Sequence, residues 1–274
     1  MFASRWMYGS VGFWVGALVE TADIFINGTA RGTLFIFELI VFGLLGMIFG
    51  LVLHRSRENN RRIVRSYHTS LESLANAVAA KDDETNGHSK RVVRYSVLIG
   101  REMGLQHRLL QQLEWGALLH DIGKIAVPDA ILKKPGALTD DEWTIMREHP
   151  QMGYLMVKNI DFLKEGTDVV LHHHERMDGR GYPHKLVGEE IPLLARIFAV
   201  ADTFDAITSD RPYRKAQSIE HAREEIARHV DTQFCRECVE AFLRLDTDDL
   251  LRVQEEAKIL DYETVQLQKL KHIS

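Results

Sequence analysis

The chain has few cysteines and prolines and no excess of positive charge. Cys235 and Cys238 are its 2 cysteines, and no second pair or neighbouring histidine completes a tetrahedral zinc site around them. A net charge of -5 without a basic stripe argues against a nucleic-acid polymer as partner. The sequence has 6 prolines, shows no internal repeat, and offers few places for a strand. We therefore expect an all-α fold.

Histidine is abundant by contrast. Eight of the 13 histidines lie between His88 and His184, and three of them, His172, His173 and His174, are consecutive. Each imidazole has two nitrogens that need partners once water is excluded, so three in a row are not all core residues. Mixed imidazole and carboxylate ligands suit iron, manganese or zinc, and a carboxylate can bridge two metals. The pattern predicts a divalent metal centre.

The spacing of charged residues points to phosphate chemistry. Glu84 and His88 stand at i,i+4, so they share one helix face if residues 75–94 are helical. Lys124 follows Asp121 by three residues, which places a cation beside the expected metal ligands. A phosphate oxygen is the natural partner of such a lysine, since a metal and an ammonium together offset the charge of a phosphodiester.

Five motifs in register resemble those of the HD-GYP phosphodiesterases over residues 75–245. The motifs are Glu84-x3-His88, His120-Asp121-x2-Lys124, Glu148-His149-Pro150, His173-His174-Glu175-x2-Asp178-Gly179-x-Gly181-Tyr182-Pro183 and Val200-Ala201-Asp202-x2-Asp205-Ala206-x-Thr208-x2-Arg211-Pro212-Tyr213-Arg214. The resemblance implies an HD-domain helical bundle. It also implies cleavage of cyclic di-GMP to pGpG, and onward to GMP, with two or three divalent ions, iron or manganese.

The resemblance also assigns roles to individual residues. It implies His120, Asp121 and Lys124 as catalytic residues, and Asp121 as the bridge between metals. The implied metal ligands are Glu84, His88, His120, Asp121, His149, His173, His174 and Asp202. The implied substrate contacts are Lys124, Gly181, Tyr182, Arg211 and Arg214. Glu84 is the residue that distinguishes three metals from two.

Several of these residues have a plainer interpretation. Without the family pattern, Glu84 is a solvated charge paired with Lys81 or Arg91, and Tyr182 belongs to a loop that only shapes the pocket rim. We expect Glu175 to orient a ligand imidazole. His172 supports the ligands or lies on the surface, and His107 and His184 are surface residues.

The N-terminal region is apolar. Residues 33–53 form a 21-residue stretch with Glu38 as its only charge, which is long enough to cross a bilayer as a helix. Residues 11–26 make a weaker first span, because they are fewer and include Glu20 and Asp23. Together they predict a transmembrane hairpin, favoured over a cleaved signal peptide or a buried core helix. The three acidic residues are expected to pair between the helices or across a homodimer.

Five arginines follow the second span and set its orientation. By the positive-inside rule they place the rest of the chain in the cytoplasm of a bacterium, with the hairpin in the inner membrane. We expect a membrane hairpin at 1–54, a helical linker at 55–76, the catalytic domain at 77–246 and a helical tail at 247–274. Further helices are expected at 218–229 and 235–245. The arginines are Arg55, Arg57, Arg61, Arg62 and Arg65.

The sequence leaves open the form of the linker and the exact function. Ile63, Tyr67, Leu71 and Leu74 recur at helical spacing, so the linker is either a signalling coiled segment or an amphipathic helix that packs on the domain. A diguanylate cyclase with a GGDEF domain is a candidate protein partner. The alternatives to cyclic di-GMP hydrolysis are a phosphohydrolase for another cyclic dinucleotide or nucleotide, and a non-catalytic cyclic di-GMP receptor or adaptor.

Overall fold

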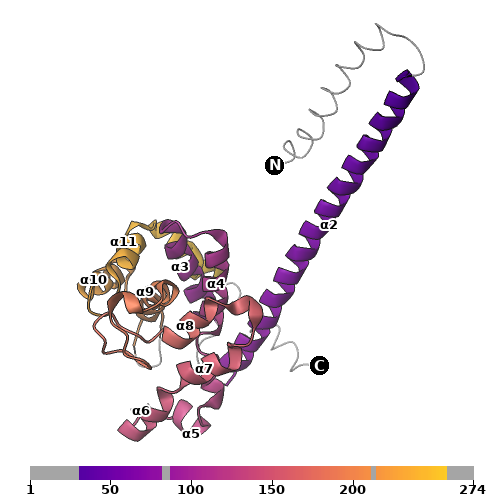
Figure 1. Ribbon diagram of the computed structural model, residues 1–274. Coiled ribbons are helices and arrows are strands. Elements are labelled where there is room, and N and C mark those ends of the chain that lie inside the picture. The colour runs from indigo at the N-terminus through magenta and orange to yellow at the C-terminus, as the bar shows by residue number, and fades with distance from the viewer. Residues whose placement is uncertain (1–30, 82–86, 211–213, 258–274) are drawn as a thin grey trace, which may run out of the picture. The chain divides into compact units, whose positions relative to one another are not determined.

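The computed structural model describes residues 31–81, 87–210 and 214–257, with side chains from residue 38 onward (Figure 1). The chain divides into two compact units, Met1–Tyr67 and His68–Ser274. Within the described ranges there is no β-strand, only isolated bridges between Asp178 and Val187 and between Val230 and Phe234. The prediction of an all-α fold is confirmed.

The first unit is described from residue 31, where the long helix α2 (Arg31–Ala79) begins. The first proline of the chain is Pro128, so this helix contains no proline. A proline would interrupt the helix because it lacks a backbone N–H. Its apolar side chains are exposed within the unit, Phe42 by 70% and Phe49 by 64%. By length and composition alone, Glu38–Ala79 qualifies as one candidate membrane span. The predicted first span, with Glu20 and Asp23, lies outside the described residues.

The second unit is a bundle of short helices. Its elements are α3 His88–Glu102, α4 His107–Leu119, η1 Ile122–Ala126, α5 Asp129–Leu132, α6 Asp140–Met146, α7 His149–Val157, η2 Asp161–Leu163, α8 Gly166–His172, η3 Gly188–Glu190, α9 Leu193–Thr208, α10 Ile219–Arg228 and α11 Arg236–Arg244. The helices expected at 218–229 and 235–245 correspond to α10 and α11. The Ser218 hydroxyl caps α10 by accepting a hydrogen bond from the His221 N–H.

Helix α9 is the centre of this bundle and packs against α3, α4, α8, α10 and α11 (Figure 1). It is apolar on most of its circumference, which is typical of a helix buried on all sides. Phe204 contacts the rings of Tyr95 and Phe242, with centroids 4.8 Å and 5.0 Å away. Its two carboxylates, Asp202 and Asp205, interrupt the apolar surface and face the functional site described below.

The linker and the residues after 246 pack differently from the sequence expectation. Of the four linker residues expected on one face, only Leu71 is buried, and Leu74 is 45% exposed. Leu71 shares its buried face with Ala75 and Val78, because the packed stripe follows i, i+4 and i+7 spacing. At the other end, residues 247–257 are helical, and Leu250 and Val253 belong to the core. The core therefore extends past residue 246.

The helix expected over residues 75–94 is interrupted. Helix α2 ends at Ala79, and α3 begins at His88 after the N-cap residue Gly87. The i,i+4 argument that placed Glu84 beside His88 required one helix through both residues, and α3 begins only at His88. The place of Glu84 beside His88 is not tested and stays a prediction. Residues 82–86, including Glu84, lie outside the described ranges.

Candidate metal centre

Helix termini supply most of the predicted metal ligands. His88 and His149 are the first residues of α3 and α7, and His120 with Asp121 follows the end of α4. His173 and His174 follow the end of α8, while Asp202 lies within α9. Side chains at helix ends can converge on one point without interrupting the apolar packing between helices. The fold thus brings together seven of the eight residues predicted as ligands.

Asp121 lies at the centre of this group. Its Oδ2 is 3.0 Å from Nε2 of His120, and its Oδ1 is 3.3 Å from Nε2 of His149 and 3.9 Å from Nε2 of His173. A second carboxylate, Asp202, has Oδ1 3.5 Å from Nε2 of His88. The His88 and His120 rings lie 5.7 Å apart, which connects the two groups. A carboxylate between several imidazoles has the arrangement needed to bridge two ions.

The other ring nitrogen of these histidines is already engaged. Nδ1 of His120 lies 2.8 Å from the Ala117 carbonyl oxygen. Nδ1 of His149 lies 2.8 Å from the Met146 carbonyl, and Nδ1 of His173 lies 3.0 Å from the Val170 carbonyl. A carbonyl oxygen only accepts, so each Nδ1 carries the proton and each Nε2 presents a lone pair. This is the state in which a histidine binds a metal.

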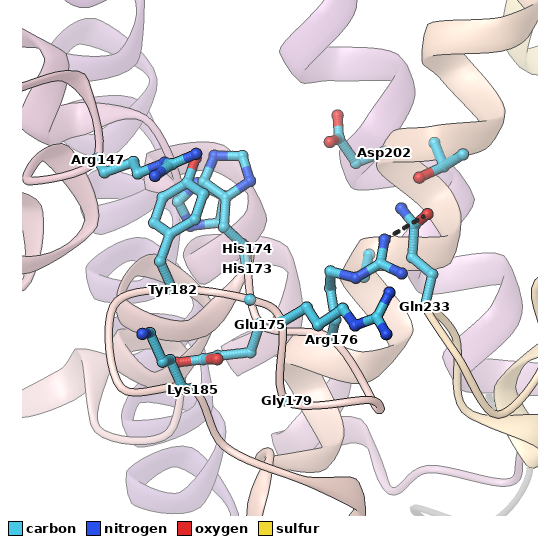
Figure 2. A pocket seen from close by; sticks show the side chains of 14 residues that line it. Arg147, His173, His174, Glu175, Arg176, Gly179, Tyr182, Lys185, Asp202 and Gln233 are labelled. Carbon is cyan, nitrogen blue, oxygen red and sulfur yellow. Dashed lines mark hydrogen bonds between the residues drawn. The ribbon is translucent and has the colours of Figure 1, made fainter. Parts of the chain in front are cut away.

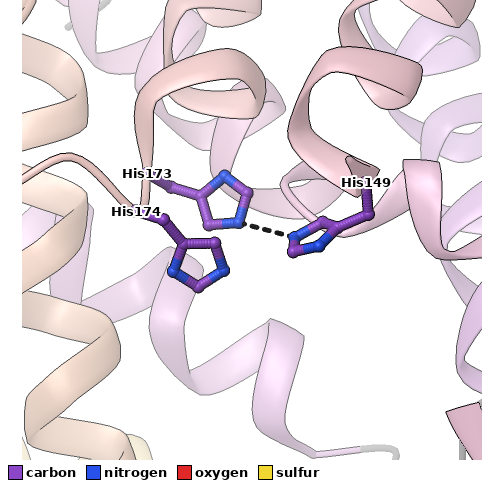
Figure 3. A group of neighbouring side chains, drawn as sticks. All are labelled: His149, His173 and His174. Atoms are coloured by element: carbon purple, nitrogen blue, oxygen red, sulfur yellow. Dashed lines mark hydrogen bonds between the residues drawn. The ribbon is translucent and has the colours of Figure 1, made fainter. Parts of the chain in front are cut away.

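Two such nitrogens face each other at a distance that suits a cation between them. Nε2 of His149 and Nε2 of His173 lie 3.2 Å apart (Figure 3). Two neutral imidazoles that both donate through Nδ1 have no proton to share at this contact. Two nitrogens bound to one ion at about 2.0–2.1 Å stand roughly 3.0–3.4 Å apart. The residues therefore fit a divalent metal.

Electrostatics favours the same states. Burial, and then the neighbouring imidazole of His174, hold the pKa of His173 well below its usual range. Burial and then His149 lower the pKa of His174 to about 3. For Asp121 burial acts in the opposite direction, yet His120 and Lys124 hold the pKa of its carboxyl well below the ordinary value. Neutral imidazoles at His173 and His174 beside an ionised carboxylate are a ready donor set for a metal.

Asp205 and Arg91 form a buried support that the sequence analysis did not assign. Nδ1 of His88 lies 2.8 Å from Oδ2 of Asp205, so its Nε2 points toward Asp202. Arg91 donates to both oxygens of Asp205, at 2.6 Å and 3.1 Å. The Asp205 carboxylate, 1% exposed, is thereby paired. The sequence did contain a signal for this role, because Asp205 stands at i,i+3 from Asp202 within the motif at 200–214.

Gly123 explains how Asp121 and His149 meet. A Cβ at this position would lie 1.8 Å from the His149 carbonyl oxygen and 2.6 Å from the Gly153 nitrogen. Because only glycine permits this approach, η1 packs directly on the start of α7.

Lys124 follows Gly123 in the chain and contacts the Asp121 carboxylate. Its Nζ lies 2.8 Å from Oδ2 of Asp121.

A cavity of about 640 Å³ opens beside these ligands, within the usual size range of small-molecule sites (Figure 2). His173, His174 and Asp202 form its wall on the metal side. The cavity is also lined by the Gln233 amide and by four basic side chains, of which Arg176 is paired with Asp178 at 2.8 Å. The basic residues are Arg147, Arg176, Arg180 and Lys185. None of these four was predicted from the sequence.

The loop after α8 is held by close backbone contacts. At Gly181 a Cβ would lie 2.5 Å from the Arg176 nitrogen and 2.6 Å from the His174 carbonyl oxygen, so glycine is required there. Glu175, expected to orient a ligand imidazole, instead accepts hydrogen bonds from the N–H groups of His184 and Leu186 at 2.7 Å and 3.1 Å. That expectation was wrong, because the loop turns back and places its own amides beside the carboxylate.

Tyr182 stacks on His174 and lies near the Arg147 guanidinium. Its ring lies 4.6 Å from the His174 ring at an interplanar angle of 28°. The Arg147 guanidinium lies 5.8 Å from the same ring and 5.6 Å from that of Trp143 (Figure 2). Burial raises the pKa of the Tyr182 phenol, so it stays protonated as a hydrogen-bond donor. Arg147 escaped the sequence analysis because its contacts come from another part of the chain.

The remaining predicted residues are placed unevenly. Arg214 is exposed and donates to the Ala206 carbonyl. Arg211 and Glu84 lie outside the described residues, so their roles stay predictions. His107 and His184 are exposed and His172 is half-buried.

Comparison with known proteins places this site in a family context. The family described as HD domain matches residues 72–237. The chain is 42% identical over 177 residues to the cyclic di-GMP phosphodiesterase response regulator RpfG of Xanthomonas campestris, covering 64% of this chain and 47% of that protein. It is 46% identical over 166 residues to the cyclic di-GMP phosphodiesterase PA4108 of Pseudomonas aeruginosa, covering 58% and 40%.

A third relative carries a different substrate in its name. The chain is 37% identical over 191 residues to 3'3'-cGAMP-specific phosphodiesterase 2 of Vibrio cholerae, covering 68% of this chain and 37% of that protein. The chain thus spans less than half the length of these three curated relatives.

Proposed function

Because this chain belongs to the HD domain family, we propose that it is a metal-dependent phosphodiesterase of the HD-GYP type that hydrolyses cyclic di-GMP to pGpG and onward to GMP. The observation that carries the proposal is the set of buried Nε2 lone pairs around the Asp121 carboxylate, next to a basic cavity. The relatives named above, with their cyclic dinucleotide substrates, support the same class of reaction.

The seven described ligands would hold two or three divalent ions, iron or manganese. When bound, such ions supply a hydroxide near neutral pH and offset charge on the phosphate. Burial keeps His173 and His174 neutral. The Nδ1 contacts with the carbonyls of Ala117, Met146 and Val170 orient His120, His149 and His173. Glu84 is proposed as the ligand that distinguishes three ions from two.

The cavity supplies the substrate contacts. Arg147, Arg176, Arg180 and Lys185 can neutralise the phosphate that is not being cleaved. Tyr182 offers an aromatic ring for a guanine base. Lys124 contacts Asp121, and we propose that it steadies both this carboxylate and the attacked phosphate. Arg211 and Arg214 stay proposed substrate contacts.

A second substrate is favoured by one specific finding. The relative from Vibrio cholerae is named as specific for 3'3'-cGAMP, which differs from cyclic di-GMP in one base. Both molecules present two phosphates and two purines to the same cavity. A receptor that binds without cleaving is less favoured, because the fold gathers seven of the eight expected ligands.

We propose that α2 anchors the chain in the bacterial inner membrane with the second unit in the cytoplasm. The exposed apolar side chains of residues 38–53 and the arginines that follow support this placement. The full chain should partition with membranes. Leu45→Lys should release part of it, because lysine at a span centre costs about 2.5–3.5 kcal/mol. Leu251→Lys, on an exposed apolar residue of the second unit, is the control. Homodimer formation and a GGDEF-type cyclase partner stay predictions.

Chromatography of products tests the activity. The full chain, purified anaerobically in detergent, is incubated with cyclic di-GMP, 3'3'-cGAMP or pGpG. The double variant His120→Ala with Asp121→Ala should lose hydrolysis by at least about a thousandfold, since metal stabilisation is worth several kcal/mol. His107→Ala, an exposed histidine, should retain the parent rate. Equal rates in parent and double variant would reject the proposal, and binding without product would favour the receptor.

A further inference from the structure

A second cluster of metal-binding groups lies outside the proposed catalytic ligands. His172 ends α8, and Glu175 and His184 stand at the beginning and end of the loop that contains Tyr182. One ligand atom of each of the three residues lies within 4.8 Å of the other two. The rings of His172 and His184 have centroids 5.3 Å apart.

One nitrogen of the His172 imidazole has no hydrogen-bond partner in the described part of the chain. This nitrogen, Nδ1, is buried from solvent. A buried nitrogen of this kind destabilises the fold when it stays unsatisfied. In the proposed catalytic site, by contrast, the Nδ1 atoms described above contact a carbonyl or a carboxylate oxygen.

The Glu175 carboxylate supplies an independent indication of a cation. The residue is 4% exposed, and its oxygens accept hydrogen bonds from the His184 and Leu186 amides. No Lys, Arg or His side chain within the described ranges forms an ion pair with it. Buried carboxylates are normally paired with a cation or coordinate a metal. A lone pair on each oxygen is still available after the two amide contacts.

We propose that His172, Glu175 and His184 form a separate binding site for one divalent transition ion, of which zinc is the best match. Two imidazoles and one carboxylate are a known zinc donor set, whereas calcium and magnesium prefer oxygen ligands alone. Bonds of about 2.0–2.1 Å require the donor atoms to stand roughly 3.4 Å apart, closer than the observed limit. The side chain of His184 is exposed, so it can move to close this gap.

An ion at this site would join the end of α8 to the residue after Pro183. The loop that carries Gly181 and Tyr182 would then be fixed at both ends, by the ion and by the Glu175 contacts with backbone amides. Arg180 and Lys185 are exposed and are trypsin sites in or beside this loop. Zinc should therefore slow cleavage after both residues.

Equilibrium dialysis of the full chain against Zn²⁺ tests the site. The wild type and the control variant His107→Ala should bind one equivalent more than His184→Ala. His172→Gln should lose the same equivalent. Trypsin cleavage after Arg180 and Lys185 should slow on addition of Zn²⁺ in the wild type and stay unchanged in His184→Ala.

The count of ions decides the proposal. If His184→Ala binds as many equivalents as the wild type, the site does not exist. Hydrolysis is assayed separately, and His184→Ala should retain a rate close to the wild type because His184 is outside the proposed catalytic set. Loss of hydrolysis in every protein, including the wild type, would reject the proposed activity and leave the zinc count unaffected.

Discussion

Nδ1 of His88 lies 2.8 Å from Oδ2 of Asp205, a residue 117 positions further along the chain. This contact joins the start of α3 to the central helix α9 and orients Nε2 of His88 toward Asp202. Arg91 binds the other side of the same carboxylate. The buried triad is therefore a structural connection and, in our proposal, a support for the metal centre.

Asp205→Asn removes the charge while keeping the shape. We expect a loss of about 3–5 kcal/mol in stability, the usual effect of breaking a buried ion pair. Metal affinity should fall about 10–100-fold, because the partner that orients His88 is weakened. Thermal unfolding and metal analysis of the detergent-purified chain measure both effects. Asp210→Asn, at an exposed residue, is the matched control. Unchanged metal content in Asp205→Asn would contradict the supporting role.

Gly123→Ala tests the close packing of η1 on α7. The new Cβ would overlap the His149 carbonyl oxygen, which is backbone and can move only with the helix. We expect a loss of about 3 kcal/mol, at the upper end for overpacking, together with loss of metal. Gly104→Ala, at a positive φ of 76° with open space around it, should cost about 1–2 kcal/mol and keep its metal. Equal metal content in both variants would disprove this explanation.

Tyr182→Ala separates substrate contact from a purely structural loop. If the ring stacks on a guanine base, KM for cyclic di-GMP should rise roughly tenfold to a hundredfold, as expected for loss of 1–3 kcal/mol of stacking. Tyr182→Phe keeps the ring and should behave like the parent. Metal content is measured in both variants, because Tyr182 also stacks on His174. An unchanged KM in Tyr182→Ala with normal metal content would assign the tyrosine to the pocket rim.

The Asp178 carboxyl makes the stability of the folded protein depend on pH. Hydrogen bonds from Arg176 lower the pKa of this carboxyl from 3.8 to about 2. A lowered pKa in the folded state stabilises the protein above pH 3.8, and this contribution disappears as the pH falls toward 2. The stability difference between wild type and Asp178→Asn should thus be constant between pH 6 and 5 and smaller at pH 3. Urea unfolding measures it, and a difference that grows on acidification would contradict the assignment.

The residues proposed as metal ligands could be named from the sequence through the motif resemblance, and their role as ligands stays a prediction. Histidines beside carboxylates in ordered motifs have few other uses, and the structure places His149, His173 and Asp121 together. The contacts of the basic cavity were not predictable in this way. Arg147 lies near Tyr182, which is in a loop 35 positions further along the chain. Exposed arginines are common on any helix. Only the tertiary arrangement shows which arginine faces the site.

Helix boundaries were the weaker part of the prediction. Helix α2 ends at Ala79 and α3 begins at His88, two boundaries that the i,i+4 spacing of charged residues in this region did not predict. The residues after 246 show the reverse case. Their apolar spacing predicted a helix, but only the packed structure shows that Leu250 and Val253 complete the core.

Anomalous diffraction from crystals of the full chain grown anaerobically with Mn²⁺ or Fe²⁺ tests the central claim most directly. We predict adjacent anomalous peaks within about 2.0–2.3 Å of Nε2 of His149 and His173 and of the Asp121 carboxylate. A third peak beside these and within bonding distance of Glu84 would assign Glu84 as a ligand, and two peaks would leave it unbound. The absence of any peak within bonding distance of these atoms would contradict the metal centre and the hydrolytic function proposed from it.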